Sequence, residues 1–76
     1  MREEYIRDFH GRIIGILRYL ANGDIEAVEF NSRQIIGFYR ASTDRTTDFF
    51  GRVIARGNAA VSLIYDAKKY LGKHSQ

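Results

Sequence analysis

Arginine and tyrosine stand next to each other at two places in this chain, Arg18-Tyr19 and Tyr39-Arg40. Such pairs bind single-stranded nucleic acid when they lie exposed on a sheet, because bases stack on the rings and phosphates pair with guanidinium groups. We therefore take these four residues as candidate nucleic-acid-binding residues. A basic track could extend through other arginines, namely Arg7, Arg12, Arg33, Arg52 and Arg56.

The same residues also have a purely structural explanation. Arginines on a solvated sheet pair with Asp and Glu of neighbouring strands. Tyr5, Tyr19 and Tyr39 can line a core with their hydroxyls at its rim. The net charge of +3 is mild, and the chain contains no RNP-type motif. We rank structural pairing ahead of nucleic-acid binding.

Residue types suited to catalysis or metal binding are sparse. Asp8 and Asp48 hold equivalent places in a repeated motif, where turn formation explains a carboxylate better than acid–base catalysis. His10 and His74 have no ligand spacing between them, and the chain has no cysteine. A nucleophile elbow and a phosphate-binding glycine loop are both missing. We expect no enzyme, no cofactor and no metal site.

The elements that must position these residues are organised around a repeat. Residues 8–15 read Asp-Phe-His-Gly-Arg-Ile-Ile-Gly, residues 48–55 read Asp-Phe-Phe-Gly-Arg-Val-Ile-Ala, and residues 30–37 are a looser echo. Asp favours the first position of a type I turn, and a glycine three residues later suits a left-handed bulge. Arg33 replaces that glycine in the middle copy, so its turn must use Asn31 or a longer loop.

Strands are predicted on either side of these turns. Asn22-Gly23 predicts a further hairpin with a type I′ turn. Gly15 and Gly37 lie inside strands, where glycine marks a bend or the close approach of another segment. The six predicted strands cover residues 3–8, 12–21, 24–30, 35–40, 45–49 and 52–56.

A helix is predicted after Gly57, with Asn58 as its N-cap and Gly72 as its C-cap. Its apolar stripe consists of Val61, Leu63, Ile64, Ala67, Tyr70 and Leu71. The predicted fold class is therefore α+β. It is an antiparallel meander of about six short strands, forming three hairpin-like repeats in a strongly bent sheet, followed by one C-terminal helix packed on the sheet.

The repeated motif resembles one found in small bacterial hypothetical proteins of about this length. The resemblance rests on residues 8–15 and 48–55 and covers most of residues 5–64. That group has no established activity, so the resemblance implies a hairpin architecture and assigns no functional residue.

Length and composition favour self-association. We expect residues 1–76 to form one domain, with the meander in 1–57, the helix in 58–72 and a frayed tail in 73–76. A domain of this size buries only about 60% of its unfolded surface, and disulfides cannot assist it. We expect a cytoplasmic homodimer that neither spans nor binds a membrane and acts as a non-enzymatic interaction or structural module. Single-stranded nucleic-acid binding is the alternative.

Overall fold

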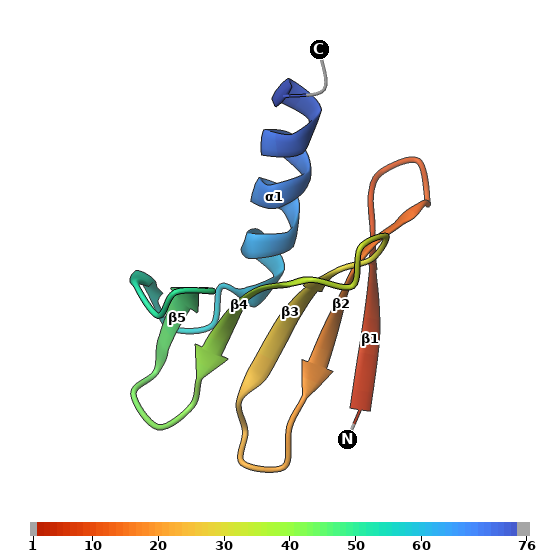
Figure 1. The fold of residues 1–76 in the computed structure, drawn as a ribbon. Helices are drawn as coiled ribbons and strands as arrows, with labels where there is room; N and C mark the ends of the chain where they lie inside the picture. The colour runs from red at the N-terminus through yellow and green to blue at the C-terminus, as the bar shows by residue number, and fades with distance from the viewer. Residues whose placement is uncertain (1, 75–76) are drawn as a thin grey trace.

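Six antiparallel strands followed by one helix form the fold, as the sequence predicts (Figure 1). The computed structural model describes residues 2–74 of the chain and the side chains of residues 2–67. Each strand pairs with the next along the chain, so β1 and β6 are the edges of an open sheet. The elements are β1 (Arg2–Arg7), β2 (Ile13–Tyr19), β3 (Ile25–Glu29), β4 (Ile35–Arg40), β5 (Arg45–Asp48), β6 (Val53–Arg56) and α1 (Ala60–His74).

The three sequence repeats are three hairpins with the same irregularity. In β1–β2 the register passes from Arg7↔Ile13 to Ile6↔Gly15, so Ile14 is the extra residue of a bulge. The register of β3–β4 skips Ile36 in the same way, and that of β5–β6 skips Ile54. Each repeat therefore places one isoleucine at a bulge just after its turn.

The repeated turns have the predicted geometry. Asp8 Oδ1 accepts the N–H of His10 at 2.9 Å, Asp48 Oδ1 accepts that of Phe50 at 2.9 Å, and the glycine after each turn is left-handed. The middle repeat closes with a longer loop, in which Arg33 itself takes the left-handed conformation with φ 64°.

The prediction of a type I′ turn at Asn22-Gly23 is wrong. Gly23 has φ 94°, but Asn22 is not left-handed, and the Gly23 N–H bonds to the Leu20 carbonyl at 3.1 Å. This is a type I turn with its bulge at glycine, as in the two repeats. Asn22 is held in place because its Oδ1 accepts the Asp24 N–H at 2.9 Å.

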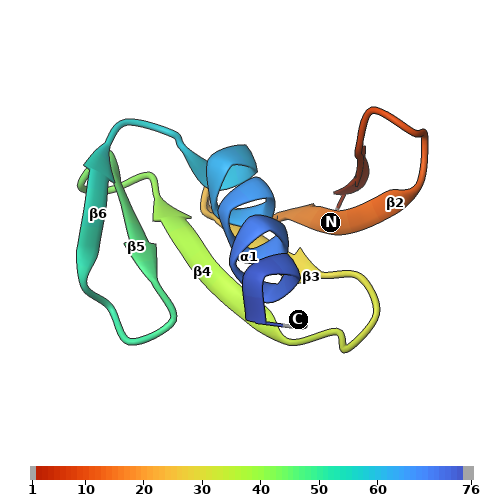
Figure 2. The ribbon, with the colours of Figure 1, turned by 90° about the horizontal axis from the view of Figure 1, so that it is seen from above.

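Helix α1 begins where the sequence predicts and packs on β2, β3 and β4 of its own sheet (Figure 2). Asn58 Oδ1 accepts the Ala60 N–H at 3.1 Å, so Asn58 is the N-cap. Thr46 Oγ1 accepts the N–H of Ala59, the residue just before the helix, at 2.8 Å. The predicted C-cap at Gly72 is wrong, because the helix continues to His74. Residues 75–76 of the expected tail lie outside the described residues.

The helix defines two faces of the sheet. We call the face under α1 the helix face and the opposite one the open face. A Cβ added to Gly15 would lie 2.5 Å from Ile64, and one added to Gly37 would meet Leu63 at 2.9 Å, so both glycines mark the predicted close approach. Leu63 and Ile64 are the buried part of the predicted stripe, Val61 is exposed, and the side chains of Tyr70 and Leu71 lie outside the described residues.

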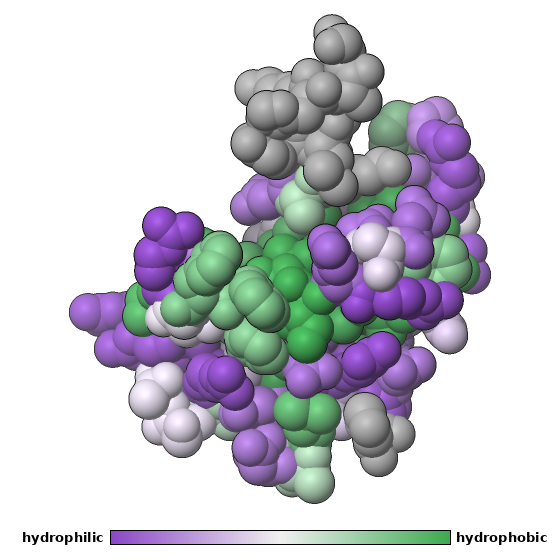
Figure 3. All heavy atoms as spheres, in the orientation of Figure 1, coloured by the Kyte–Doolittle hydropathy of each residue, from purple (hydrophilic) through white to green (hydrophobic). Residues whose placement is uncertain are grey.

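The main core lies between α1 and the helix face. The view in Figure 3 shows hydrophobic residues gathered in the middle of the molecule and bordered by hydrophilic ones. No helix among the described residues is long and apolar enough to cross a membrane. The strong bend expected of the sheet stays a prediction. The core cluster consists of Ile6, Ile14, Leu17, Ile25, Ala27, Ala60, Leu63 and Ile64.

Candidate functional site

The four residues nominated from the sequence do not share a surface. Side chains of directly opposite residues lie on the same face, and successive residues alternate. Gly37 faces the helix, and Tyr39 lies two residues further along the same strand, so Tyr39 points to the helix face. Ile25 stands directly opposite both Tyr39 and Tyr19, so Tyr19 lies on the helix face too. Arg18 and Arg40 therefore lie on the open face.

All four nominated residues make ion pairs or hydrogen bonds with acidic residues, as structural side chains do. Arg18 forms ion pairs with Glu3 at 3.2 Å and Glu26 at 3.7 Å, one on each neighbouring strand. The Tyr19 hydroxyl donates a hydrogen bond to Glu4 at 2.7 Å, and this bond raises the pKa of Tyr19. Tyr19 also packs against the core, so its ring is not free for a base.

Tyr39 and Arg40 lie side by side in sequence and have different surroundings. The Tyr39 hydroxyl donates to Asp44 at 2.7 Å, which raises the pKa of Tyr39, and its ring packs against the core. Arg40 donates from Nη1 to Asp24 at 3.2 Å and remains partly exposed on the open face. Arg40 is thus paired through Nη1 alone, whereas Arg18 is paired through both Nε and Nη1.

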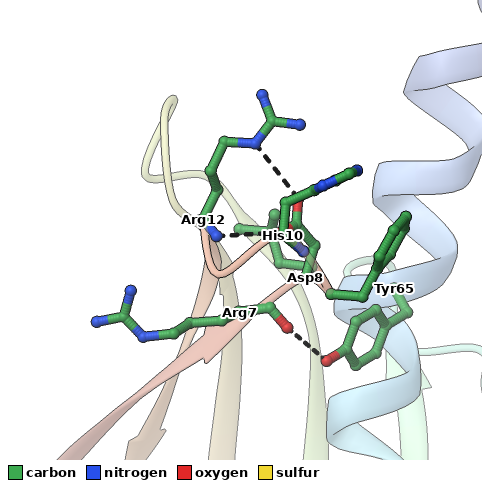
Figure 4. A pocket seen from close by; sticks show the side chains of 7 residues that line it. Arg7, Asp8, His10, Arg12 and Tyr65 are labelled. Carbon is green, nitrogen blue, oxygen red and sulfur yellow. Dashed lines mark hydrogen bonds and ion pairs between the residues drawn. The ribbon is translucent and has the colours of Figure 1, made fainter.

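A hollow lies between the β1–β2 turn and α1 (Figure 4). It has a volume of about 580 Å³ and opens widely to solvent. The Tyr65 hydroxyl donates to the Arg7 carbonyl at 2.7 Å across it, which ties the helix to the end of β1. The Asp8 carboxylate, which lines the hollow, accepts the backbone N–H groups of His10 and Arg12 in the turn. The hollow is lined by Arg7, Asp8, Phe9, His10, Arg12, Ile14 and Tyr65.

The two motif carboxylates are held in their charged form by their turns. Partial burial raises the pKa of Asp8, but the N–H groups of Arg12 and His10 outweigh it and leave the pKa below its ordinary value. Partial burial also raises the pKa of Asp48, but the Arg52 N–H and the Arg52 guanidinium, whose Nε lies 2.7 Å from Asp48 Oδ2, outweigh it and lower the pKa. A general acid near neutral pH needs the opposite shift. Turn formation therefore accounts for both residues.

The bulge isoleucine is exposed in the third repeat, whereas it is covered in the first two. Ile14 is 5% exposed and Ile36 packs against the core, whereas Ile54, at the equivalent bulge, is 55% exposed. Its neighbour Val53 is 63% exposed. The cause is the position of α1, which packs on β2 to β4 and does not extend over β6. Sequence reasoning missed these residues, although their place in the repeat was visible.

A second feature missed from the sequence is a row of arginines on the open face. Arg40 stands directly opposite Arg45, and Arg45 directly opposite Arg56. We call Arg40, Arg45 and Arg56 the arginine row. Arg45 was not nominated, but the short polar loop after β4 was a signal that would have placed it opposite Arg40.

The chain matches no protein-family model, no curated protein and no solved structure. Among the described residues, no three His, Cys, Asp or Glu gather where they could hold a metal ion.

Proposed function

We propose that this protein is a small non-enzymatic interaction module that forms a homodimer by pairing β6 with β6 of a second copy. The observation that carries the proposal is the exposure of Ile54. The same bulge position is buried in the first repeat and packed against the core in the second. A second copy laid against β6 would give Ile54 the cover that α1 gives Ile14.

The two edges of the sheet differ in a way that supports β6 as the interface. Edge strands expose unpaired N–H and C=O groups, and charged side chains discourage other chains from pairing with them. In β1 the charged residues are Arg2, Glu3, Glu4 and Arg7, four of its six residues. In β6 only Arg56 is charged, and the other three residues are Val53, Ile54 and Ala55. The β6 edge therefore lacks the protection that β1 has.

Symmetry also suits this arrangement. An antiparallel strand pair can be related by a two-fold axis, so one apolar strand serves both copies as a self-complementary surface. Two exposed aromatics at the adjoining turn, Phe49 and Phe50, extend the apolar area. The small size of the chain and its lack of cysteine make such help valuable and fit a cytoplasmic location, which we include in the proposal.

The first prediction tests the interface with a charged substitution. Ile54→Lys places an unpaired ammonium group at the centre of the strand pair, so the dimer dissociation constant should rise at least about tenfold, which corresponds to about 1.4 kcal/mol. Sedimentation equilibrium over a range of concentrations measures it. The matched control is Phe9→Lys, the same kind of change at a side chain that is 93% exposed on the other hairpin.

Two results would count against the dimer. A wild-type protein that is monomeric at tens of micromolar removes the proposal outright. Equal weakening by Ile54→Lys and Phe9→Lys would show that β6 is not the interface.

A further inference from the structure

The arginine row is an arrangement that the folded chain alone does not explain. Directly opposite side chains on neighbouring strands approach closely, and like charges in that position destabilise a sheet. Strands lie about 4.8 Å apart, so Arg40, Arg45 and Arg56 cover about 10 Å across β4, β5 and β6. All three side chains leave the sheet on the open face, away from α1.

Acidic neighbours compensate only part of this charge. Asp24 accepts from Arg40 at 3.2 Å and also accepts the Ala41 N–H at 2.8 Å. Arg45 donates to two backbone carbonyls, those of Thr43 and Asp44, which carry no net charge. The Arg56 guanidinium has no ion-pair partner within residues 2–67. Among residues 2–67, Asp24 is thus the carboxylate that forms an ion pair with a member of the row.

Part of the row is already oriented for a ligand. The Arg40 guanidinium lies 4.3 Å from the centre of the Phe38 ring, which is on the same strand and the same face. Stacking on a ring together with the bond to Asp24 restricts the rotation of Arg40, so less side-chain entropy is lost when it binds. Guanidinium groups present paired N–H donors that match phosphate oxygens.

The surroundings of the row favour an extended ligand over a compact one. The hollow beside the β1–β2 turn and a second hollow, lined by Arg33, Gln34, Ile35 and Phe49, contain no member of the row. A chain of phosphates can contact successive guanidinium groups on an open strand surface, whereas a small anion gains little without a pocket. The Phe38 ring is covered by Arg40 and does not offer a stacking surface to a base. The site would therefore contact the sugar-phosphate backbone of the nucleic acid and make no base-specific contacts.

We propose that the arginine row binds the phosphodiester backbone of single-stranded nucleic acid without sequence preference. Arg40, Arg45 and Arg56 each contact phosphate, and Phe38 holds Arg40 in place. All three arginines belong to one chain, and the site adjoins the proposed homodimer interface because Arg56 lies on β6. It also differs from the surface nominated from the sequence, because Tyr19 and Tyr39 lie on the helix face.

The second prediction is a binding measurement with a fluorescent mixed-sequence single-stranded DNA of about twelve nucleotides. Arg45→Gln and Arg56→Gln should each weaken the dissociation constant about threefold to tenfold. Each should also reduce the slope of log affinity against log salt by about one, because one phosphate contact is lost. Anisotropy at several salt concentrations gives both quantities.

The matched control is Arg12→Gln, which removes the same charge from an exposed arginine outside the row. It should leave affinity within about twofold of wild type. Equal weakening by Arg12→Gln would overturn the site, because only net charge would then matter. No binding at low salt overturns it as well, as would equal or tighter binding of duplex DNA, of inorganic triphosphate or of vesicles containing phosphatidylserine.

A stability measurement separates ligand binding from a structural role. Arg56→Gln relieves like-charge repulsion, so without nucleic acid its melting temperature should equal or exceed that of wild type. A structural arginine would show a decrease. A clear fall in melting temperature together with weaker DNA binding would therefore overturn the assignment of Arg56.

Discussion

At the residue scale, Gly15 and Gly37 each leave room for one side chain of α1. A Cβ on Gly15 would lie 2.5 Å from Ile64 Cγ2, and its three nearest neighbours are all side-chain atoms of Ile64. A Cβ on Gly37 would clash with the backbone carbonyl oxygen of Thr47, which cannot move without breaking the β4–β5 ladder. These two positions therefore tolerate a methyl group to different extents.

The third prediction follows from this difference. Gly15→Ala should lower the free energy of unfolding by about 1–3 kcal/mol, the usual cost of overpacking, and Gly37→Ala should lower it more. Urea unfolding at constant m value measures both. Ala55→Gly is the control, because the third repeat already has alanine there, and it should cost at most about 1 kcal/mol. Stability unchanged by Gly37→Ala would mean that the Thr47 carbonyl oxygen lies farther from Gly37 than the structure shows.

The fourth prediction concerns acid stability and the turn carboxylates Asp8 and Asp48. Both have a folded pKa below the ordinary value, so the folded state binds fewer protons than the unfolded one in the carboxyl range. Their contribution is present above the unfolded pKa and is lost as the pH falls through the folded pKa. The melting temperature of wild type should therefore fall between about pH 5 and about pH 2.

Asp48→Asn should make that fall shallower, because Asn keeps an acceptor for the turn N–H groups and does not titrate. Asp8→Asn should have a smaller effect, since the Arg12–Asp8 ion pair is 3.6 Å long and the Arg52–Asp48 pair 2.7 Å. Melting curves across this pH range test the order. An acid profile identical to wild type in both variants would contradict the role given to these turns.

At the scale of elements, the repeat made most of the fold predictable. The turn residues, the alternation along the strands and the Asn58 cap are local signals, and the structure follows them. The bulges at Ile14, Ile36 and Ile54 were not predicted, because a bulge depends on how two strands pair and leaves little trace in either strand alone. Repetition of Ile-Ile or Val-Ile after each turn was the available sign.

The hairpin at Gly23 shows why a local signal can mislead. Asn-Gly suits a type I′ turn, yet the same pair also suits a type I turn followed by a left-handed glycine. The side chain of Asn22, bonded to the Asp24 N–H, favours the second arrangement here. The helix end differs for a related reason, since glycine permits a C-cap but does not require one.

At the scale of the whole molecule, the four residues nominated from the sequence divide between the two faces of the sheet. Neighbours in a strand point to opposite faces, so Tyr39 and Arg40 cannot act on one ligand from the same side. Arg45 and Arg56 join Arg40 only through the pairing of three strands. That register is set by loop lengths and bulges, which a single sequence does not specify completely.

The fifth prediction asks whether the sheet can fold without α1. The helix supplies Ala60, Leu63 and Ile64 to the core, and replacing a buried Leu or Ile by Ala typically costs about 2–5 kcal/mol. A chain of this length has a total free energy of unfolding of about 4–11 kcal/mol. The cost of losing all the core side chains of the helix therefore exceeds the total stability of the fold. Truncation after Gly57 should therefore abolish folding, which amide NMR spectra would show as collapsed dispersion.

Val61→Ala in the full chain is the control, because Val61 is 41% exposed and should leave the spectrum dispersed. Dispersed amide signals from residues 1–57 alone would mean that the open face, with Ile16 and Val28 both fully buried, forms a sufficient core by itself.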